Sequence, residues 1–244
     1  MQNQFDPRTT GVDPAIAVGV PTVARDAGLR SYMLSVYNYM ASGVLLTGIV
    51  ALALAMTGVA QAIFMGGGIF KYVIIFAPLI MILVMGARMQ RMSTSGMQAF
   101  FWAFAAVMGV SMSVIPLIYS GSSIATTFFA TAAAFLSLSL YGYTTKKDLS
   151  GFGTFLIMGV VGLIVVMIGN MFIQSKGLSL AISAIGVLIF AGLTVYDTQK
   201  IKSIYAHVAG TDMIGKTAIM GALTLYLDFI NMFQFLLSFM GSRE

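Results

Sequence analysis

The chain has 244 residues, of which 59% are hydrophobic and only 9% are charged, and its mean hydropathy is +0.94. A soluble domain carries about a quarter charged residues, so this composition excludes an ordinary globular enzyme and indicates a polytopic membrane protein. The net charge of +5 is interpreted as basic residues that set orientation at the membrane, which excludes a nucleic-acid surface.

Metal-binding side chains of the common kinds are scarce. The chain has no cysteine and a single histidine, His207, which excludes disulfides, thiolate metal sites and His-rich metal sites. Four methionines share one helical face, a pattern more typical of packing between helices than of copper ligation: Met81, Met85, Met89 and Met92. No tightly bound cofactor is therefore expected.

The N-terminal 31 residues are polar and are interrupted by Pro7, Pro14 and Pro21. Because no apolar run precedes the first span, they predict a flexible tail and not a cleavable signal peptide. The tail is either a solvated end or a handle for a partner or protease. The predicted domains are this cytosolic tail, residues 1–31, and a transmembrane domain, residues 32–244.

Long charge-free runs, broken by glycine and serine clusters, predict seven transmembrane helices and an all-α fold. They are expected at about 33–57, from near 69 to 88, and at about 97–118, 124–143, 152–174, 178–199 and within 216–243. Ala105, Gly109 and Ser113 recur every four residues and predict a face for close helix packing.

The basic residues predict the orientation. An N-terminus on the inside collects ten of the thirteen basic residues on that side and leaves Lys71, Lys176 and Arg243 outside. Basic residues concentrate in cytoplasmic loops, so the N-terminus is predicted to be cytosolic and the C-terminus external.

The seventh predicted helix carries one acid, Asp228, deep in an apolar run. A carboxylate at such a position is costly unless it is neutralised, paired or wetted, which favours a functional role. Four uncharged residues share its helical stripe: Thr217, Gly221, Thr224 and Asn231. The stripe is alternatively an interhelical hydrogen-bonding strip.

A second acid, Asp197, lies in the last turns of the sixth predicted helix, on a face shared with Thr194. At 1.5 Å per residue, Asp197 is expected roughly 5 Å inside the membrane and Asp228 about 15 Å inside. This mismatch of about 10 Å closes only if helix seven is tilted or begins below the membrane.

If the two carboxylates meet, repulsion and desolvation favour one shared proton near neutral pH. Loss of that proton leaves two negative charges that must attract a cation or open to water. Hard oxygen donors suit transient Ca²⁺, with Thr194, Thr224 and Asn231 as candidate pore-lining or supporting residues. The alternative is a neutral pair that only joins the two helices.

Two arginines at the inner end of the second predicted helix, Arg88 and Arg91, are the candidate counter-charges for this pair. A guanidinium held against one carboxylate would neutralise the site and could close it. The ordinary interpretation is that both arginines face lipid headgroups and set topology.

Three stretches closely resemble the Bax inhibitor-1 family, particularly its bacterial members: residues 141–150 (YGYTTKKDLS), 195–201 (VYDTQKI) and 222–231 (ALTLYLDFIN). The resemblance spans all predicted helices. It implies six helices around a central C-terminal seventh, a pH-sensitive calcium leak, and an inner-membrane location. It also implies a di-aspartyl sensor at Asp197 and Asp228 and an arginine latch, for which Arg88 is the best match. Where some relatives carry an acid in helix two, this chain has Ala77, Pro78 and Leu79.

The same resemblance implies a second hypothesis. Bacterial relatives are linked to a membrane-bound AAA protease, so the chain is alternatively an interaction protein whose tail the protease grips. An intramembrane aspartyl protease is disfavoured, because Asp197 follows Val195 and Tyr196, and Asp228 follows Tyr226 and Leu227, with no GxGD motif. No enzymatic activity is expected.

Overall fold

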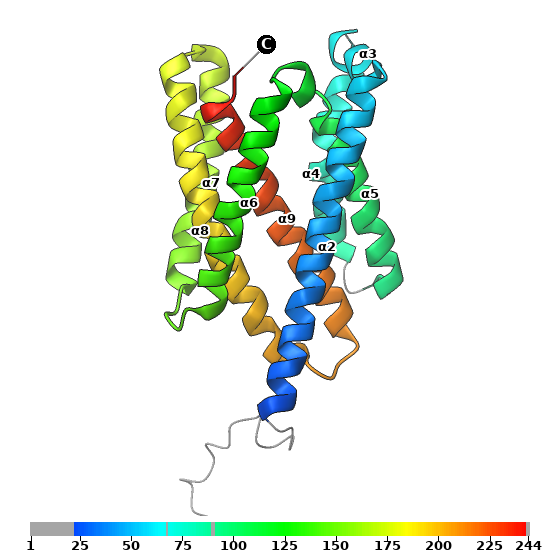
Figure 1. The fold of residues 1–244 in the computed structure, drawn as a ribbon, viewed down its shortest axis with the longest axis vertical. Coiled ribbons are helices and arrows are strands. Elements are labelled where there is room, and N and C mark those ends of the chain that lie inside the picture. Colours follow the sequence, from blue (N-terminus) through cyan, green and yellow to red (C-terminus); the bar gives the residue numbers. More distant parts are fainter. Residues whose placement is uncertain (1–21, 67, 89–90, 243–244) are drawn as a thin grey trace, which may run out of the picture.

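The computed structural model describes residues 22–66, 68–88 and 91–242, and the regular elements within these ranges are helices (Figure 1). In chain order they are α2 (Thr22–Met56), α3 (Val59–Met65), α4 (Phe70–Arg88), α5 (Thr94–Met112), the 3-10 turn η2 (Ile115–Leu117), α6 (Gly121–Thr144), α7 (Ser150–Ile173), α8 (Lys176–Val208) and α9 (Met213–Met240). By length and composition, seven of these helices can cross a membrane. The predicted all-α class and number of spans are confirmed.

The last helix, α9, occupies the centre of the bundle. Figure 1 shows it crossing the bundle obliquely, and it packs against α8, α2, α6 and α5. In its membrane segment 61% of the residues are buried inside the protein, compared with 11% to 39% in the other spans. Its most enclosed side chains form much of the core: Ile219, Leu225, Tyr226, Met232 and Leu237. The predicted arrangement of six helices around a C-terminal seventh is confirmed.

Two helices extend beyond their predicted ends. α8 continues to Val208, nine residues past the predicted end at 199, and α9 already begins at Met213. Lys200 and Lys202 limit the apolar span, but lysine is a good helix former and does not end a helix in water. The chain reverses at Gly210, whose φ of 78° suits glycine.

The first helix also begins before its predicted start. α2 starts at Thr22, so residues 22–31 of the predicted tail are helical, while residues 1–21 lie outside the described residues. Pro21 is the last proline before the helix, and no helix breaker follows it until Gly28. The predicted start at about 33 was therefore wrong, because charged residues such as Arg25 and Arg30 limit the apolar span but do not prevent helix formation.

The small-residue face of α5 lies against α2, as predicted. Ala105, Gly109 and Ser113 are all buried, and a Cβ atom added at Gly109 would lie 2.8 Å from the Thr47 carbonyl oxygen. Thr47 Oγ1 donates a hydrogen bond to the Ala105 carbonyl at 2.8 Å. Small residues thus allow the two backbones to approach closely.

A proline inside α4 is compensated by a neighbouring helix. Pro78 has no N–H group, so the carbonyl of Ile74, four residues earlier, loses its intrahelical donor. Ser111 Oγ in α5 donates to this carbonyl at 2.6 Å. In a membrane an unsatisfied carbonyl is costly, so this bond both satisfies Ile74 and joins α4 to α5.

Candidate functional site

The structure brings the two acids of the spans together. Asp197 lies in α8 and Asp228 in α9, and the two carboxyl groups are within hydrogen-bonding reach of each other. Asp197 is 9% exposed and Asp228 is 4% exposed. Two ionised carboxylates cannot hydrogen-bond to each other, so this contact holds as a bond only when the pair carries a proton.

The depth mismatch expected from the sequence is smaller because both helices are longer than predicted. Counted from the turn between them, Asp197 lies 11 residues before Val208 and Asp228 lies 15 residues after Met213. The axial difference is then about 6 Å instead of about 10 Å.

Few other groups act on the pair. Among the described residues, the only other charged group that acts on Asp197 or Asp228 is Lys200, one turn after Asp197 in α8. Asp228 Oδ2 is buried and accepts no hydrogen bond from a donor in the described part of the chain. Lys200 is exposed and its ammonium also lies 5.8 Å from the centre of the Tyr196 ring. The deeper carboxyl, Asp228, therefore depends on Asp197 for its polar contact.

The candidate latch residues are not at the pair in this conformation. Arg88 is the last residue of α4, Arg91 lies in the following turn, and both are exposed. Neither belongs to the charged groups that act on Asp197 or Asp228. Their exposure is compatible with either interpretation, and both the latch and the contact with lipid headgroups stay predictions.

The three candidate supporting residues are bonded to their own helices. Thr194 Oγ1 donates to Phe190 O at 2.8 Å, Thr224 Oγ1 to Met220 O at 3.1 Å and Asn231 Nδ2 to Leu227 O at 2.8 Å. Thr194 is fully buried, while Thr224 and Asn231 are half-buried. The hydroxyl donors of Thr194 and Thr224 and one of the two N–H donors of Asn231 are therefore used, and the three side chains can still offer oxygen lone pairs to a cation.

A chain of hydroxyl groups next to Asp197 was missed by the sequence reasoning. Tyr37 Oη and Ser139 Oγ are 2.7 Å apart, and Ser139 Oγ and Thr198 Oγ1 are 2.9 Å apart. Thr198 Oγ1 in turn donates to Thr194 O at 2.7 Å. The chain links α2, α6 and α8. Its one sequence signal is Thr198, which directly follows Asp197 in the family-like stretch.

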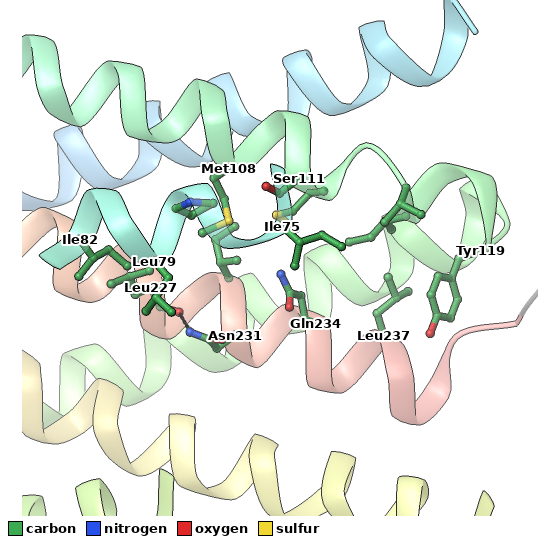
Figure 2. A pocket seen from close by; sticks show the side chains of 15 residues that line it. Ile75, Leu79, Ile82, Met108, Ser111, Tyr119, Leu227, Asn231, Gln234 and Leu237 are labelled. Atoms are coloured by element: carbon green, nitrogen blue, oxygen red, sulfur yellow. Dashed lines mark hydrogen bonds between the residues drawn. The ribbon is translucent and has the colours of Figure 1, made fainter. Parts of the chain in front are cut away.

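A cavity of about 500 Å³ lies between α4, α5 and α9. Figure 2 shows Asn231 and Gln234 of α9 among its lining residues, with Ser111 of α5 and apolar side chains of α4 such as Ile75 and Leu79. Asp228 does not line it, but Leu227 and Asn231, which flank Asp228 along α9, do. The cavity therefore ends within one helical turn of the buried pair.

The donor set does not make a storage site for a metal ion. Within the described residues no group of three or more histidine, cysteine, aspartate or glutamate side chains is placed to hold a metal. Ca²⁺ takes six to eight oxygen ligands, so two carboxyl groups would supply only part of its shell. The remaining ligands would have to be water, hydroxyl or carbonyl oxygens.

Comparison with known proteins agrees with these features. A family model described as "Inhibitor of apoptosis-promoting Bax1" matches residues 29–244. An uncharacterised protein of Rickettsia prowazekii is 47% identical over 90% of this chain and 92% of its own length. The Escherichia coli inner membrane protein YbhL is 41% identical over 89% of this chain and 94% of its own length. Together with the seven candidate spans, six of them around α9, these matches show that the chain is an integral membrane protein of the Bax inhibitor-1 family.

Proposed function

We propose that this protein is a calcium leak channel whose conduction is controlled by the protonation of Asp197 and Asp228. The observation that carries the proposal is the contact between these two carboxyl groups inside the bundle. Paired acids in a membrane interior usually mark an ion or proton pathway, because their desolvation is too costly for a purely structural role. A neutral pair that only joins α8 and α9 is the competing interpretation.

The charge of the site argues for a cation. With one proton the pair carries a single negative charge, and without it the pair carries two charges in an enclosed, apolar setting. That excess charge favours entry of a cation, and hard carboxylate oxygens favour Ca²⁺ over softer ions. Because only two acids are present, the ion would be held weakly, which suits passage and not storage.

In this scheme the cavity between α4, α5 and α9 is the approach to the pair. Asn231 and Gln234 give its α9 wall a polar strip, and this strip begins three residues after Asp228. An ion that enters the cavity would keep most of its water until it reaches the turn of α9 that carries Asp228. Beyond that turn the ion would lose its water, and only the carboxyl pair would offset the free-energy cost of that desolvation.

A flux assay on the purified protein tests the proposal. Proteoliposomes with an internal calcium dye should show a leak that depends on the protein and grows with the calcium gradient. Asp197→Asn and Asp228→Asn each remove one charge with little change in shape and should reduce the leak by about tenfold or more, the effect of losing a buried charge contact. Asp212→Asn is the matched control, because Asp212 is exposed and makes no side-chain cap to α9.

The interaction hypothesis predicts a different outcome. If the protein has no protein-dependent leak, and its only effect is on the turnover of another protein by a membrane-bound protease, the channel proposal is wrong. That effect should then be lost when residues 1–25 are deleted. Only residues 22–25 of this segment lie within the described chain, where they form the start of α2, so this alternative stays a prediction from the family resemblance.

A further inference from the structure

A groove between α2 and α6 has one basic end and an apolar body. Its volume is about 490 Å³, within the range of small-molecule sites. It is lined by Arg30, Met33, Leu34 and Tyr37 of α2 and by Leu136, Ser139, Leu140 and Tyr143 of α6. Both helices are membrane spans, so the groove lies on the surface of the bundle at membrane depth.

The groove opens toward the surface of the bundle. Leu34, Leu136 and Leu140 are 51%, 65% and 64% exposed, respectively. Large apolar side chains on membrane spans are exposed where they face lipid tails. The floor is formed by buried Met33 and Ser139. A ligand in this groove would therefore enter from the bilayer and not from water.

The polar groups of the floor are already satisfied. Ser139 Oγ is bonded to both Tyr37 Oη and Thr198 Oγ1. Apart from the hydroxyl group of Tyr143, the body of the groove thus offers no unmet donor or acceptor to a polar ligand, and its leucine walls suit a hydrocarbon chain. The other polar feature is the guanidinium of Arg30 at one end.

The charge of Arg30 has no partner in the part of the chain that the structure describes. No hydrogen bond or ion pair joins it to another described residue. Arg30 lies four residues after Asp26, where the candidate span begins, so its Cα atom is about 6 Å along the helix from that end. Lys202, whose Nζ donates to the Tyr143 carbonyl at 2.7 Å, adds a second positive charge beside Tyr143 at the same end.

We propose that this groove binds an anionic phospholipid, with its phosphate on Arg30 and one acyl chain along Leu34, Leu136 and Leu140. A guanidinium binds phosphate oxygens through paired, charge-assisted hydrogen bonds. Arg30 lies at the predicted cytosolic end, where anionic lipids are attracted to basic residues near the ends of spans. The apolar part of the groove lies next to this charge, so the groove fits a lipid better than a free phosphate ion. A free phosphate ion would leave the apolar part of the groove empty.

The proposal is tested by native mass spectrometry of the full-length protein released from nanodiscs that contain equal amounts of phosphatidylglycerol and phosphatidylcholine. The unchanged protein should retain phosphatidylglycerol preferentially. Arg30→Gln should lower that retention about fivefold, the effect of one basic residue at a membrane surface, and Arg30→Lys should lower it less. Lys146→Gln, an exposed charge at the same end that does not line the groove, should have no effect.

A second pair of variants tests the acyl-chain part without changing charge. Leu140→Trp should fill the groove and reduce retention of phosphatidylglycerol, whereas Leu45→Trp should not. Leu45 and Leu140 are both 64% exposed, and Leu45 does not line the groove, so the two changes are matched in exposure. Equal retention of both lipids, or no response to Arg30→Gln, overturns the proposal. An effect of Arg30→Gln without an effect of Leu140→Trp overturns the assigned acyl-chain position.

Discussion

Asp197 of α8 and Asp228 of α9 contact each other inside the bundle. Within the described residues, no lysine or arginine is buried beside them. The charged group that acts on them from outside the pair is Lys200, at the exposed side of Asp197. Asp228 is the deeper and more enclosed of the two. In the proposed channel, the protons or cations that reach this pair would set its charge.

The calcium leak is expected to rise with pH. Each proton lost from the pair adds a negative charge to the site, which favours entry of a cation. Flux into proteoliposomes should be measured with the same pH on both sides, stepped from about 6 to 8. Asp197→Asn and Asp228→Asn should flatten the profile, because each leaves one ionisable carboxyl group, while Asp212→Asn should retain it.

A leak that falls as pH rises would contradict this scheme. It would favour the arginine latch instead, because an ionised carboxylate would then hold a guanidinium and close the site. In that case Arg88→Gln should raise the leak at high pH. Arg91→Gln tests whether the neighbouring arginine acts in its place.

Because α6 and α8 lie very close together beside the pair, a single methyl group added to α6 at Gly142 should lower the stability of the protein. A Cβ atom at Gly142 would lie 2.4 Å from the Val195 carbonyl oxygen and 3.1 Å from Thr198 Cβ. Gly142→Ala should therefore lower the free energy of unfolding in detergent by about 1–3 kcal/mol, because the two helices must separate. Since Val195 and Thr198 flank Asp197, the leak should change as well.

The matched control is Gly162→Ala in α7, where an added Cβ atom meets nothing within 4 Å. Alanine has the higher helix propensity, so this variant should be neutral or more stable by up to about 1 kcal/mol. Equal destabilisation by both changes would mean that the cost at Gly142 does not come from the contact with α8.

The sequence was enough to predict the spans and to single out Asp197 and Asp228, but it left open whether the two acids meet. Apolar runs of membrane length and a lone acid within each of two such runs are strong signals, because a buried charge is rarely tolerated without a role. The resemblance supplied the central place of α9, which composition could not. The ends of α8 and α9 were harder to predict, since Lys200 and Lys202 mark the limit of the apolar span but not of the helix.

The contacts around the pair could not be predicted for a different reason. Tyr37 and Ser139 are separated by 102 residues, and Ser139 and Thr198 by 59. Hydroxyl residues are common in membrane helices, where most of them bond to their own backbone. Only the crossing of α2, α6 and α8 selects these three. Arg88 is the opposite case. Its positive charge made it a candidate partner for the carboxyl pair, but in the structure it does not act on either carboxyl group.

The carboxyl group of Asp148, in the loop before α7, predicts a measurable titration outside the membrane. It accepts hydrogen bonds from Ser150 Oγ at 2.7 Å and from Ser150 N at 2.9 Å, and these donors hold its pKa below the usual range. Its stabilising contribution is therefore present above the unfolded-state pKa and is lost as pH falls through the folded-state pKa.

Carbon-13 NMR titration of labelled aspartates, with Asp148 assigned from the spectrum of Asp148→Asn, measures this pKa. Ser150→Ala removes the hydroxyl donor and should raise the pKa part of the way toward its usual value, since the backbone N–H remains. Ser203→Ala, a loss of a hydroxyl that bonds the Lys200 carbonyl, should leave it unchanged. An identical pKa in the Ser150→Ala protein would show that the hydroxyl does not hold the carboxylate.

Because Ser111 Oγ donates to the Ile74 carbonyl, the stability cost of changing Ser111 in α5 should depend on whether Pro78 is present in α4. Ser111→Ala leaves that carbonyl without a donor, so it should cost about 1–3 kcal/mol of unfolding free energy. Pro78→Ala restores an N–H group that can bond Ile74 within α4, so the cost of Ser111→Ala should shrink in that background. A double-mutant cycle measures this coupling.

Ser137→Ala is the control, since its hydroxyl is exposed and bonds its own helix at Ala133 O. If Ser111→Ala costs the same with and without Pro78, the serine does not compensate for the proline, and α4 is joined to α5 by side-chain packing alone.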